Sequence, residues 1–316
     1  MDKLHGAIAI PPPARRIVRK DSRPNFRIRR AAFCLIVATL VFGRPLYRLA
    51  AFAASSDLYS YILLIPFISG YIGWRERHRF DFQPTSNRRI AVGLFLGAGA
   101  VLGAYLVAQP AGLDLAVEDQ LALTTTSFLL TSVALVAWFL GRAFVGRFLF
   151  PIGLLAFLVP LPSAAVSAIE AFMQYGSATV ARLLFGIFGP MVFSQDLNFQ
   201  LPGIVLRVAP ECSGLRSTLA LAIVSLVAGY LLLRSRTLRT ILAVAVVPLA
   251  LLRNGFRIFV VGNLCVRLGP QMIDSYIHRQ GGPIFFVLSL VPFFALVFFL
   301  RRCERERSGD LKGSQN

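Results

Sequence analysis

Long apolar segments constrain this chain more than any other feature of its sequence. Several of them reach the roughly 18 to 20 residues that are needed to cross the hydrocarbon core of a bilayer. Hydrophobic residues make up 56% of the chain and charged residues only 15%, whereas an ordinary soluble domain carries roughly 25% charged residues. A soluble protein of 316 residues cannot bury that much apolar surface. The sequence therefore predicts an all-α polytopic membrane protein.

Eight transmembrane helices are predicted from the apolar segments and from the charges and prolines that end them. They cover residues 31–43, 58–74, 90–108, 121–141, 148–162, 214–233, 238–259 and 283–300. Residues 163–190 have a helical but amphipathic pattern, which predicts an interfacial or re-entrant helix pair on the outer side. Alternating apolar and polar residues on either side of Pro202-Gly203 predict a short β-hairpin. Such a hairpin belongs in the outer aqueous layer, because its strand edges cannot face lipid.

The basic residues predict how these helices are oriented. Of the 33 lysines and arginines, 24 lie in five segments, residues 1–30, 75–89, 142–147, 234–239 and 301–312. These segments alternate with connections that carry little positive charge, which is the positive-inside pattern. The net charge of +18 is therefore attributed to membrane topology, and no nucleic-acid partner is expected. Arg44 and Arg48, at the outer end of the first span, are expected to extend their charged ends toward the interface.

The same pattern divides the chain into three parts. Residues 1–30 form a basic cytoplasmic segment, residues 31–300 the transmembrane domain, and residues 301–316 a cytoplasmic tail. We expect a multi-pass protein of the plasma (inner) membrane with both termini in the cytoplasm. Its active site would then lie on the outer (periplasmic) face.

Three groups of polar residues lie at the predicted outer ends of the last three spans. The first contains Glu211, Cys212 and Arg216, where the hairpin leads into a helix whose N-terminus favours a thiolate. The second contains Arg253, Asn254 and Arg257, with the two arginines one helical turn apart, and the third contains His278. Polar residues near membrane depth are costly, and they are therefore functional candidates.

Each group alone has an ordinary explanation. Cys212 would be a buried residue at a helix start, Arg253 and Arg257 would bind lipid phosphates, and His278 would be an idle loop residue. None of these explanations requires the three groups to lie at the same ends of neighbouring spans. A nucleophile, a guanidinium and an imidazole on one face of a helical cluster favour attack on a carbonyl. The sequence contains no H-E-x-x-H motif, and no metal or cofactor is expected.

Several short motifs follow one another from about Asp57 to Phe286. The N-terminal motifs are Asp57-Leu-Tyr-Ser60, Ile65-Pro66, Phe150-Pro151 and Val159-Pro-Leu-Pro162. The central motif is Ala209-Pro-Glu-Cys-Ser-Gly-Leu-Arg-Ser217, followed by Asn254-Gly-Phe-Arg257 and His278-x-x-x-Gly282. In order and spacing these motifs resemble the exosortase/archaeosortase family, which implies a membrane-embedded thiol protease and transpeptidase. Cys212 matches the nucleophile, Arg257 the arginine and His278 the histidine, while Arg216, Asn254, Glu211 and Arg253 would support them or contact substrate.

The resemblance also implies a class of substrates. Family members recognise exported proteins that end in a Pro-Glu-Pro-like motif, a transmembrane helix and a basic cluster. They cut near the motif through a thioester and are thought to transfer the protein to an acceptor, in connection with exopolysaccharide production and cell-surface sorting. The alternative from another class is a transporter or scaffold subunit of polysaccharide or lipid export. In that alternative Arg216, Arg253 and Arg257 would bind a lipid phosphate.

The clustered bases generate a first prediction, about orientation. Reporter fusions placed after Leu300 and within residues 191–210 should report opposite compartments, the cytoplasm for the first and the outer side for the second. The measurement is the activity of a reporter that works in only one compartment. If both fusions report the same side, the predicted location of Cys212 on the outer face is wrong.

Overall fold

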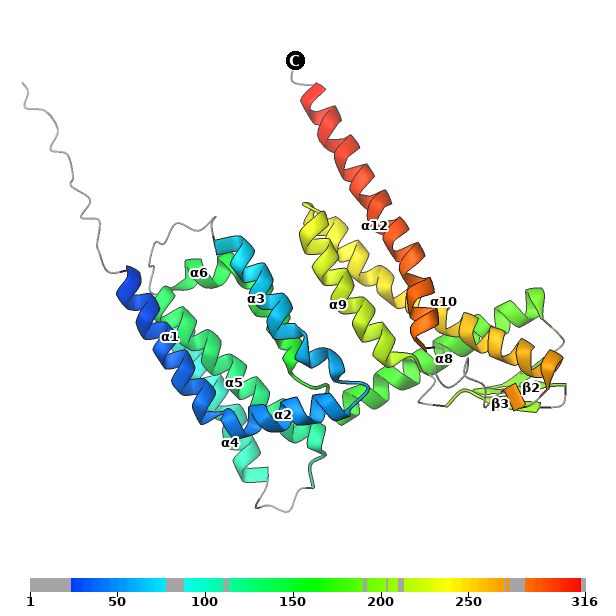
Figure 1. Ribbon diagram of the computed structural model, residues 1–316, viewed down its shortest axis with the longest axis horizontal. Helices are drawn as coiled ribbons and strands as arrows, with labels where there is room; N and C mark the ends of the chain where they lie inside the picture. The colour runs from blue at the N-terminus through cyan, green and yellow to red at the C-terminus, as the bar shows by residue number, and fades with distance from the viewer. Residues whose placement is uncertain are drawn as a thin grey trace, which may run out of the picture.

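The computed structural model describes residues 24–77, 88–108, 110, 114–189, 192–202, 204–209, 213–269, 271–272 and 282–313. The N-terminal half is helical (Figure 1). Its elements are α1 (Pro24–Val41), α2 (Gly43–Ser55), η1 (Ser60–Leu63), α3 (Ile65–Glu76), α4 (Arg88–Ala108), α5 (Val117–Leu140), α6 (Arg142–Arg147), α7 (Leu149–Leu154) and η3 (Leu155–Leu158).

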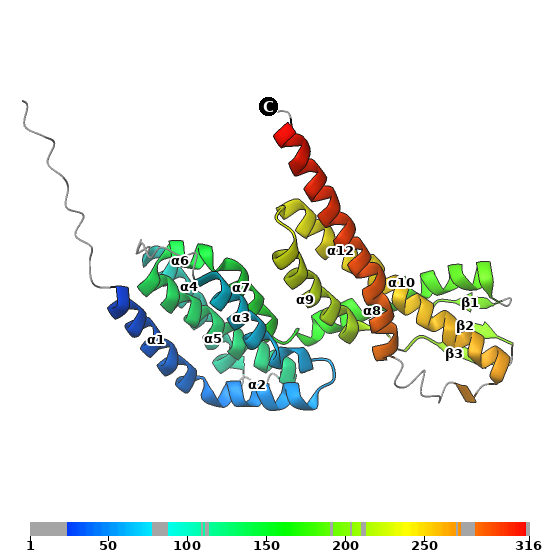
Figure 2. The same ribbon diagram turned by 45° about the horizontal axis from the view of Figure 1, so that its top comes forward.

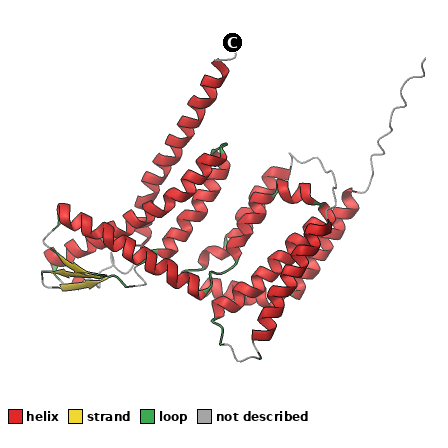
Figure 3. Ribbon diagram, turned by 180° about the vertical axis from the view of Figure 1, so that it is seen from behind, coloured by secondary structure: helices red, strands yellow, loops and turns green. Residues whose placement is uncertain are grey.

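The C-terminal half combines long helices with one small sheet. Its elements are α8 (Ser163–Phe188), β1 (Phe193–Gln195), β2 (Asn198–Leu201), β3 (Ile204–Arg207), α9 (Leu215–Leu232), α10 (Arg236–Leu268) and α12 (Gly282–Gly313). Figure 3 shows the three strands gathered at one edge of an otherwise helical molecule.

The predicted membrane-spanning character is confirmed. Five of the described helices are long and apolar enough to cross a membrane: α4, α5, α9, α10 and the Gly282–Glu306 part of α12. The number rises to seven if each of two bent helix pairs, α1 with α2 and α7–η3 with α8, is taken as one span. This is roughly the eight that the sequence predicts. The segment predicted as the second span forms η1 and the 12-residue helix α3.

Three boundaries differ from the sequence prediction. The predicted amphipathic helix pair is a single 26-residue helix, α8. Helix α10 continues past residue 259 to Leu268 and passes through Pro248 without ending, so Arg253 and Arg257 lie inside a 33-residue helix. Helix α12 likewise continues past residue 300 into its charged end.

Helix α2 turns away from α1 by 68° immediately after Phe42. Its buried residues Leu49 and Ala53 pack against Tyr59, Ile62 and Leu121, so α2 lies across the helices of the N-terminal half. Arg44, Tyr47 and Arg48 of the same helix are exposed, so α2 has one buried apolar side and one exposed polar side, as an interfacial helix does.

Helix α8 begins after the proline-rich corner at Pro160 and Pro162, where the chain bends by 93°. The Asp119 carboxylate of α5 accepts hydrogen bonds from the Ser163 backbone N–H at 2.9 Å and from the Ser163 hydroxyl at 2.7 Å. An acidic side chain at this position satisfies a backbone donor and matches the positive end of the helix dipole. A residue of the N-terminal half therefore caps the helix on which the C-terminal half is built.

The predicted β-hairpin is confirmed, with one additional strand. Strands β2 and β3 are antiparallel with Phe199 opposite Leu206, and β1 adds to the other side of β2. Phe199 and Leu206 point toward the helices and are buried with Phe185 of α8 and Ile258 of α10. Figure 2 shows the sheet beside the ends of α8 and α10. The sheet therefore has one apolar face covered by helices.

Helices α8 and α10 approach closely because glycines lie between them. A Cβ on Gly255 would be 2.5 Å from Val180 Cβ, and a Cβ on Gly262 would be 2.6 Å from the Phe185 ring. Small residues are the usual means by which membrane helices approach each other. This approach brings the polar residues of α10 next to those of α8.

The described basic segments gather at one end of the helices. In Figure 1, α6, the turn between α9 and α10 and the C-terminal end of α12 lie toward the top, while α2, the sheet and most of α8 lie toward the bottom. At the basic end the ring of Phe150 stacks on that of Tyr230 at 3.9 Å, and Arg147 pairs with Glu76 at 3.0 Å. This distribution agrees with the charge pattern from which orientation is predicted, and the membrane side of each end stays a prediction.

Candidate functional site

The candidate site is organised around the start of α9. Gly214, the residue before the helix, has φ +75° and lies in the left-handed region. Its carbonyl oxygen accepts hydrogen bonds from the Thr218 backbone N–H at 3.0 Å, the Thr218 hydroxyl at 2.8 Å and the Ser217 hydroxyl at 3.0 Å. Glycine suits this position because it adopts the left-handed region without a Cβ penalty.

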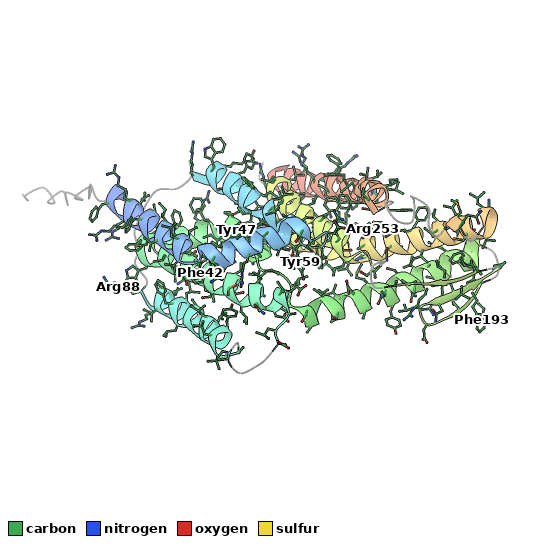
Figure 4. The ribbon with its side chains drawn as sticks, turned by 60° about the horizontal axis from the view of Figure 1, so that its bottom comes forward. Phe42, Tyr47, Tyr59, Arg88, Phe193 and Arg253 are labelled. Atoms are coloured by element: carbon green, nitrogen blue, oxygen red, sulfur yellow. The ribbon has the colours of Figure 1, made fainter. Side chains whose placement is uncertain are left out.

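Arg253 of α10 reaches the same turn from the neighbouring helix. Its Nη2 donates to the Gly214 carbonyl oxygen at 3.2 Å and to Thr218 Oγ1 at 3.2 Å. The residue is only 9% exposed, and its buried Nη1 has no hydrogen-bond partner among the residues that the structure describes. Figure 4 labels Arg253 on α10. A buried guanidinium is costly, so its two hydrogen bonds fix it against one particular turn.

Asn254 joins three elements at this point. Its Nδ2 donates to the Ser177 hydroxyl of α8 at 3.0 Å and to the Ser213 carbonyl oxygen at 3.2 Å. Asn254 is 2% exposed and Ser177 is fully buried. Because this amide donates to both α8 and the turn before α9, it holds α10 in register with both of them.

The segment that carries Cys212 is held on both sides. On the preceding side, Gln174 of α8 donates from Nε2 to the Val208 carbonyl oxygen at 3.2 Å. On the following side, Asn254 holds the Ser213 carbonyl oxygen and Arg253 holds that of Gly214. Pro210, Glu211 and Cys212 lie outside the described residues. The chain on either side of them is therefore anchored by buried side chains of α8 and α10.

Arg257 lies one turn beyond Arg253 and lines a small pocket. The other walls come from β3 and the residue after it, and from the same face of α10: Leu206, Arg207, Val208, Asn254, Ile258 and Val261. The cavity volume is about 20 Å³, which is room for about one water molecule. Arg257 therefore lines a small, mostly apolar pocket beside the anchored segment.

Arg216 of α9 pairs with a residue of the N-terminal half. Its Nη1 lies 3.0 Å from the Asp57 carboxylate. Both side chains are largely exposed, at 61% and 91%, so the pair itself contributes little stability, on the order of 0–1 kcal/mol. It does connect the first motif of the N-terminal half with the motif around the cysteine.

Of the seven site residues that the sequence predicts, the structure places four. Arg253, Asn254 and Arg257 share one face of α10, and Arg216 is the second residue of α9, with its side chain directed to Asp57. Glu211, Cys212 and His278 lie outside the described residues. Sequence reasoning missed Gln174, Ser177 and Thr218, which hold the site together. Each of them is a polar side chain in an otherwise apolar helix, and this feature of the sequence could have identified them.

The geometry of the turn generates a prediction for Gly214. A Cβ at this position would lie 3.0 Å from Arg253 Nη2 and 3.2 Å from Asn254 Oδ1, and the left-handed backbone is itself strained for alanine. Gly214→Ala should therefore lower the free energy of unfolding by about 1–3 kcal/mol. The measurement is thermal unfolding of the purified protein in detergent. Gly103→Ala is the matched control, because nothing lies within 4 Å of a Cβ at Gly103 of α4, and an unchanged melting temperature for Gly214→Ala would contradict the account of the turn.

Comparison with known proteins identifies the family. A search of curated proteins and a search of solved structures found no match. The family model for transmembrane exosortases of the EpsH type matches residues 53–295. That match covers most of the chain, including α3 to α10, the sheet and the motif segments around Asp57, Cys212, Asn254 and His278. The chain therefore belongs to the transmembrane exosortase family.

Proposed function

We propose that this protein is a membrane cysteine protease and transpeptidase that cleaves C-terminal sorting signals of exported proteins. Membership of the exosortase family supports a transpeptidase-like role in the membrane. The observation that carries the finer proposal is the anchoring of the cysteine-bearing segment. Buried amides and a guanidinium from two helices hold the backbone on both sides of it. A nucleophile needs such fixed positioning, because misplacement by a fraction of an ångström is costly for catalysis.

The proposed reaction begins with the Cys212 thiolate. Its sulfur attacks the scissile carbonyl carbon, and the carbonyl oxygen gains negative charge that the Arg257 guanidinium stabilises. His278 gives a proton to the leaving amine as the carbon–nitrogen bond breaks, which leaves the exported protein as a thioester on Cys212. An incoming amine then attacks the thioester, loses its proton to His278 and releases the thiolate. Water in place of the amine gives a carboxylate and a simple hydrolysis.

The remaining site residues have positioning roles in this proposal. Arg253 and Asn254 hold the turn at Ser213 and Gly214, and they are already engaged by it. Arg257 is less buried than Arg253 and Asn254 and lines the pocket next to β3, which favours it as the arginine that meets substrate. The proposed substrates are exported proteins that end in a Pro-Glu-Pro-like motif, a transmembrane helix and a basic cluster. The proposed setting is the outer face of the plasma membrane, in connection with exopolysaccharide and cell-surface sorting.

The central test of this proposal is Cys212→Ala. We expect it to abolish processing of a co-expressed exported reporter with such a signal, because no other thiol would form the thioester. The measurement is the ratio of full-length to cleaved reporter on a gel, together with hydroxylamine release of any reporter that is covalently attached to the enzyme. Cys34→Ala is the control, since Cys34 is a free cysteine on α1, and it should process normally. Normal processing by Cys212→Ala would favour the export-component alternative.

A second prediction separates the two arginines of α10. Arg257→Lys keeps the charge but loses the planar fork, so turnover should fall about 10²-fold or more with little change in melting temperature. Arg253→Lys should keep more of its turnover, while the loss of hydrogen bonds to Gly214 and Thr218 lowers its melting temperature. Processing rates and thermal unfolding are measured on both variants. The reverse ranking of turnover would assign the substrate contact to Arg253.

A further inference from the structure

A larger cavity with a polar lining lies in the N-terminal half, between α2 and the helices α4 and α5. Its volume is about 630 Å³, which is within the range of small-molecule sites, about 300–1,000 Å³. Three helices contribute the polar part of its lining: Arg44, Tyr47 and Arg48 from α2, Tyr105 from α4, and Gln120 and Thr124 from α5. This cavity shares no lining residue with the pocket at Arg257.

Two arginines, Arg44 and Arg48, give the cavity a positive charge. Arg44 and Arg48 are one helical turn apart, so they face the same side of α2. Within the part of the chain that the structure describes, neither arginine forms an ion pair, and no aspartate or glutamate lines the cavity. Two guanidinium groups together with a tyrosine hydroxyl are suited to the oxygens of a phosphate ester.

The position of the cavity matches the level of lipid headgroups. Helix α1 exposes a series of apolar side chains up to its last residue, with Leu40 at 74% and Val41 at 73% exposure. Such a surface in a membrane protein contacts acyl chains. Helix α2 then turns by 68° and places Arg44, Tyr47 and Arg48 immediately beyond this apolar surface, and Figure 4 labels Tyr47 on α2. Arginine and tyrosine are typical of the interface where hydrocarbon ends.

Helix α4, which forms the wall of the cavity at Tyr105, also exposes apolar side chains next to the polar lining. Leu106 and Val107, at the same end of α4 as Tyr105, are 58% and 68% exposed. A ligand in the cavity would therefore have hydrocarbon-facing surface on both sides and donors between them. A lipid with a phosphate headgroup combines both features, whereas a free phosphate ester uses only the donors.

We propose that the cavity formed by α2, α4 and α5 binds the phosphate headgroup of a membrane lipid through Arg44 and Arg48. The acyl chains lie along the exposed apolar surfaces of α1 and α4. Tyr47 and the polar side chains of α4 and α5 complete the lining around the headgroup. This site is separate from the cysteine-bearing segment, and it does not depend on the reaction proposed above.

The test measures binding to the purified full-length chain in a mild non-ionic detergent by microscale thermophoresis. The probes are dioctanoylphosphatidylglycerol, dioctanoylglycerol, which lacks the phosphate, and glycerol 3-phosphate, which lacks the acyl chains. The variant is Arg44→Gln/Arg48→Gln. The matched control is Arg301→Gln/Arg305→Gln, a second pair of arginines one turn apart on α12, whose C-terminal end lies opposite to α2 in Figure 1.

We expect the wild type to bind dioctanoylphosphatidylglycerol and the Arg44→Gln/Arg48→Gln variant to bind it at least about ten-fold more weakly, because charged hydrogen bonds are lost. The control pair should stay within about two-fold of the wild type, since charges outside the cavity make only screened interactions with the headgroup. Equal affinity in the cavity variant, or equally tight binding of dioctanoylglycerol, would overturn the proposal. Arginine-dependent binding of glycerol 3-phosphate with the same affinity would overturn the lipid as the source of the phosphate.

Folding of the variants is checked by size-exclusion chromatography. Both arginines are exposed, so their replacement should leave the chain folded. If the double variant does not fold, the single variants Arg44→Gln and Arg48→Gln decide the matter. A loss of affinity of about three-fold or more in either one supports the site, and unchanged affinity in both overturns it.

Discussion

The hydrogen bonds from Arg253 and Asn254 to the turn before α9 are the constraint on which the C-terminal half depends. A guanidinium in a membrane-spanning helix is costly, about 2.5–3.5 kcal/mol at the centre on insertion scales. The cost is reduced here because Arg253 is covered by protein and donates to Gly214 and Thr218. Any displacement of α9 relative to α10 would remove these acceptors and leave a buried charge without partners. The polar cluster therefore fixes the register of the two helices more narrowly than apolar packing would.

The glycines extend the same constraint to α8. Gly255 allows α10 to approach α8 closely enough for Asn254 to reach the Ser177 hydroxyl. Any larger residue at Gly255 would meet Val180 and hold the helices apart. In lipid, where apolar packing discriminates weakly between helix positions, close approach combined with one buried amide is an efficient way to specify a single arrangement. The same arrangement holds the residue before the cysteine-bearing segment, because Gln174, which donates to the Val208 carbonyl oxygen, lies on the same helix as Ser177.

The sequence was informative where a local pattern determines the structure. Apolar length predicted α4, α5, α9 and α12, and strict alternation around Pro202 predicted the β2–β3 hairpin. Local sequence pattern did not predict the parts of the structure that depend on contacts between distant segments. The amphipathic pattern of 163–190 suggested two interfacial helices, whereas its polar residues Gln174 and Ser177 are buried against α10 and the segment after β3 in one helix. No property of Arg253 and Arg257 in the sequence reveals which one is engaged by the turn at Gly214, because that depends on how α9 and α10 pack.

Helix α8 forms hydrogen bonds with both halves of the molecule. Its first residue, Ser163, is capped by Asp119 of α5, and its middle supports the backbone around the cysteine through Gln174 and Ser177. A 26-residue helix rises about 1.5 Å per residue and bends little without a proline or a defect. Because α5 also forms a wall of the cavity at Arg44 and Arg48, the element that bounds that cavity is hydrogen-bonded to the element that positions the candidate site. The two sites are thus connected through α5 and α8, although they share no residue.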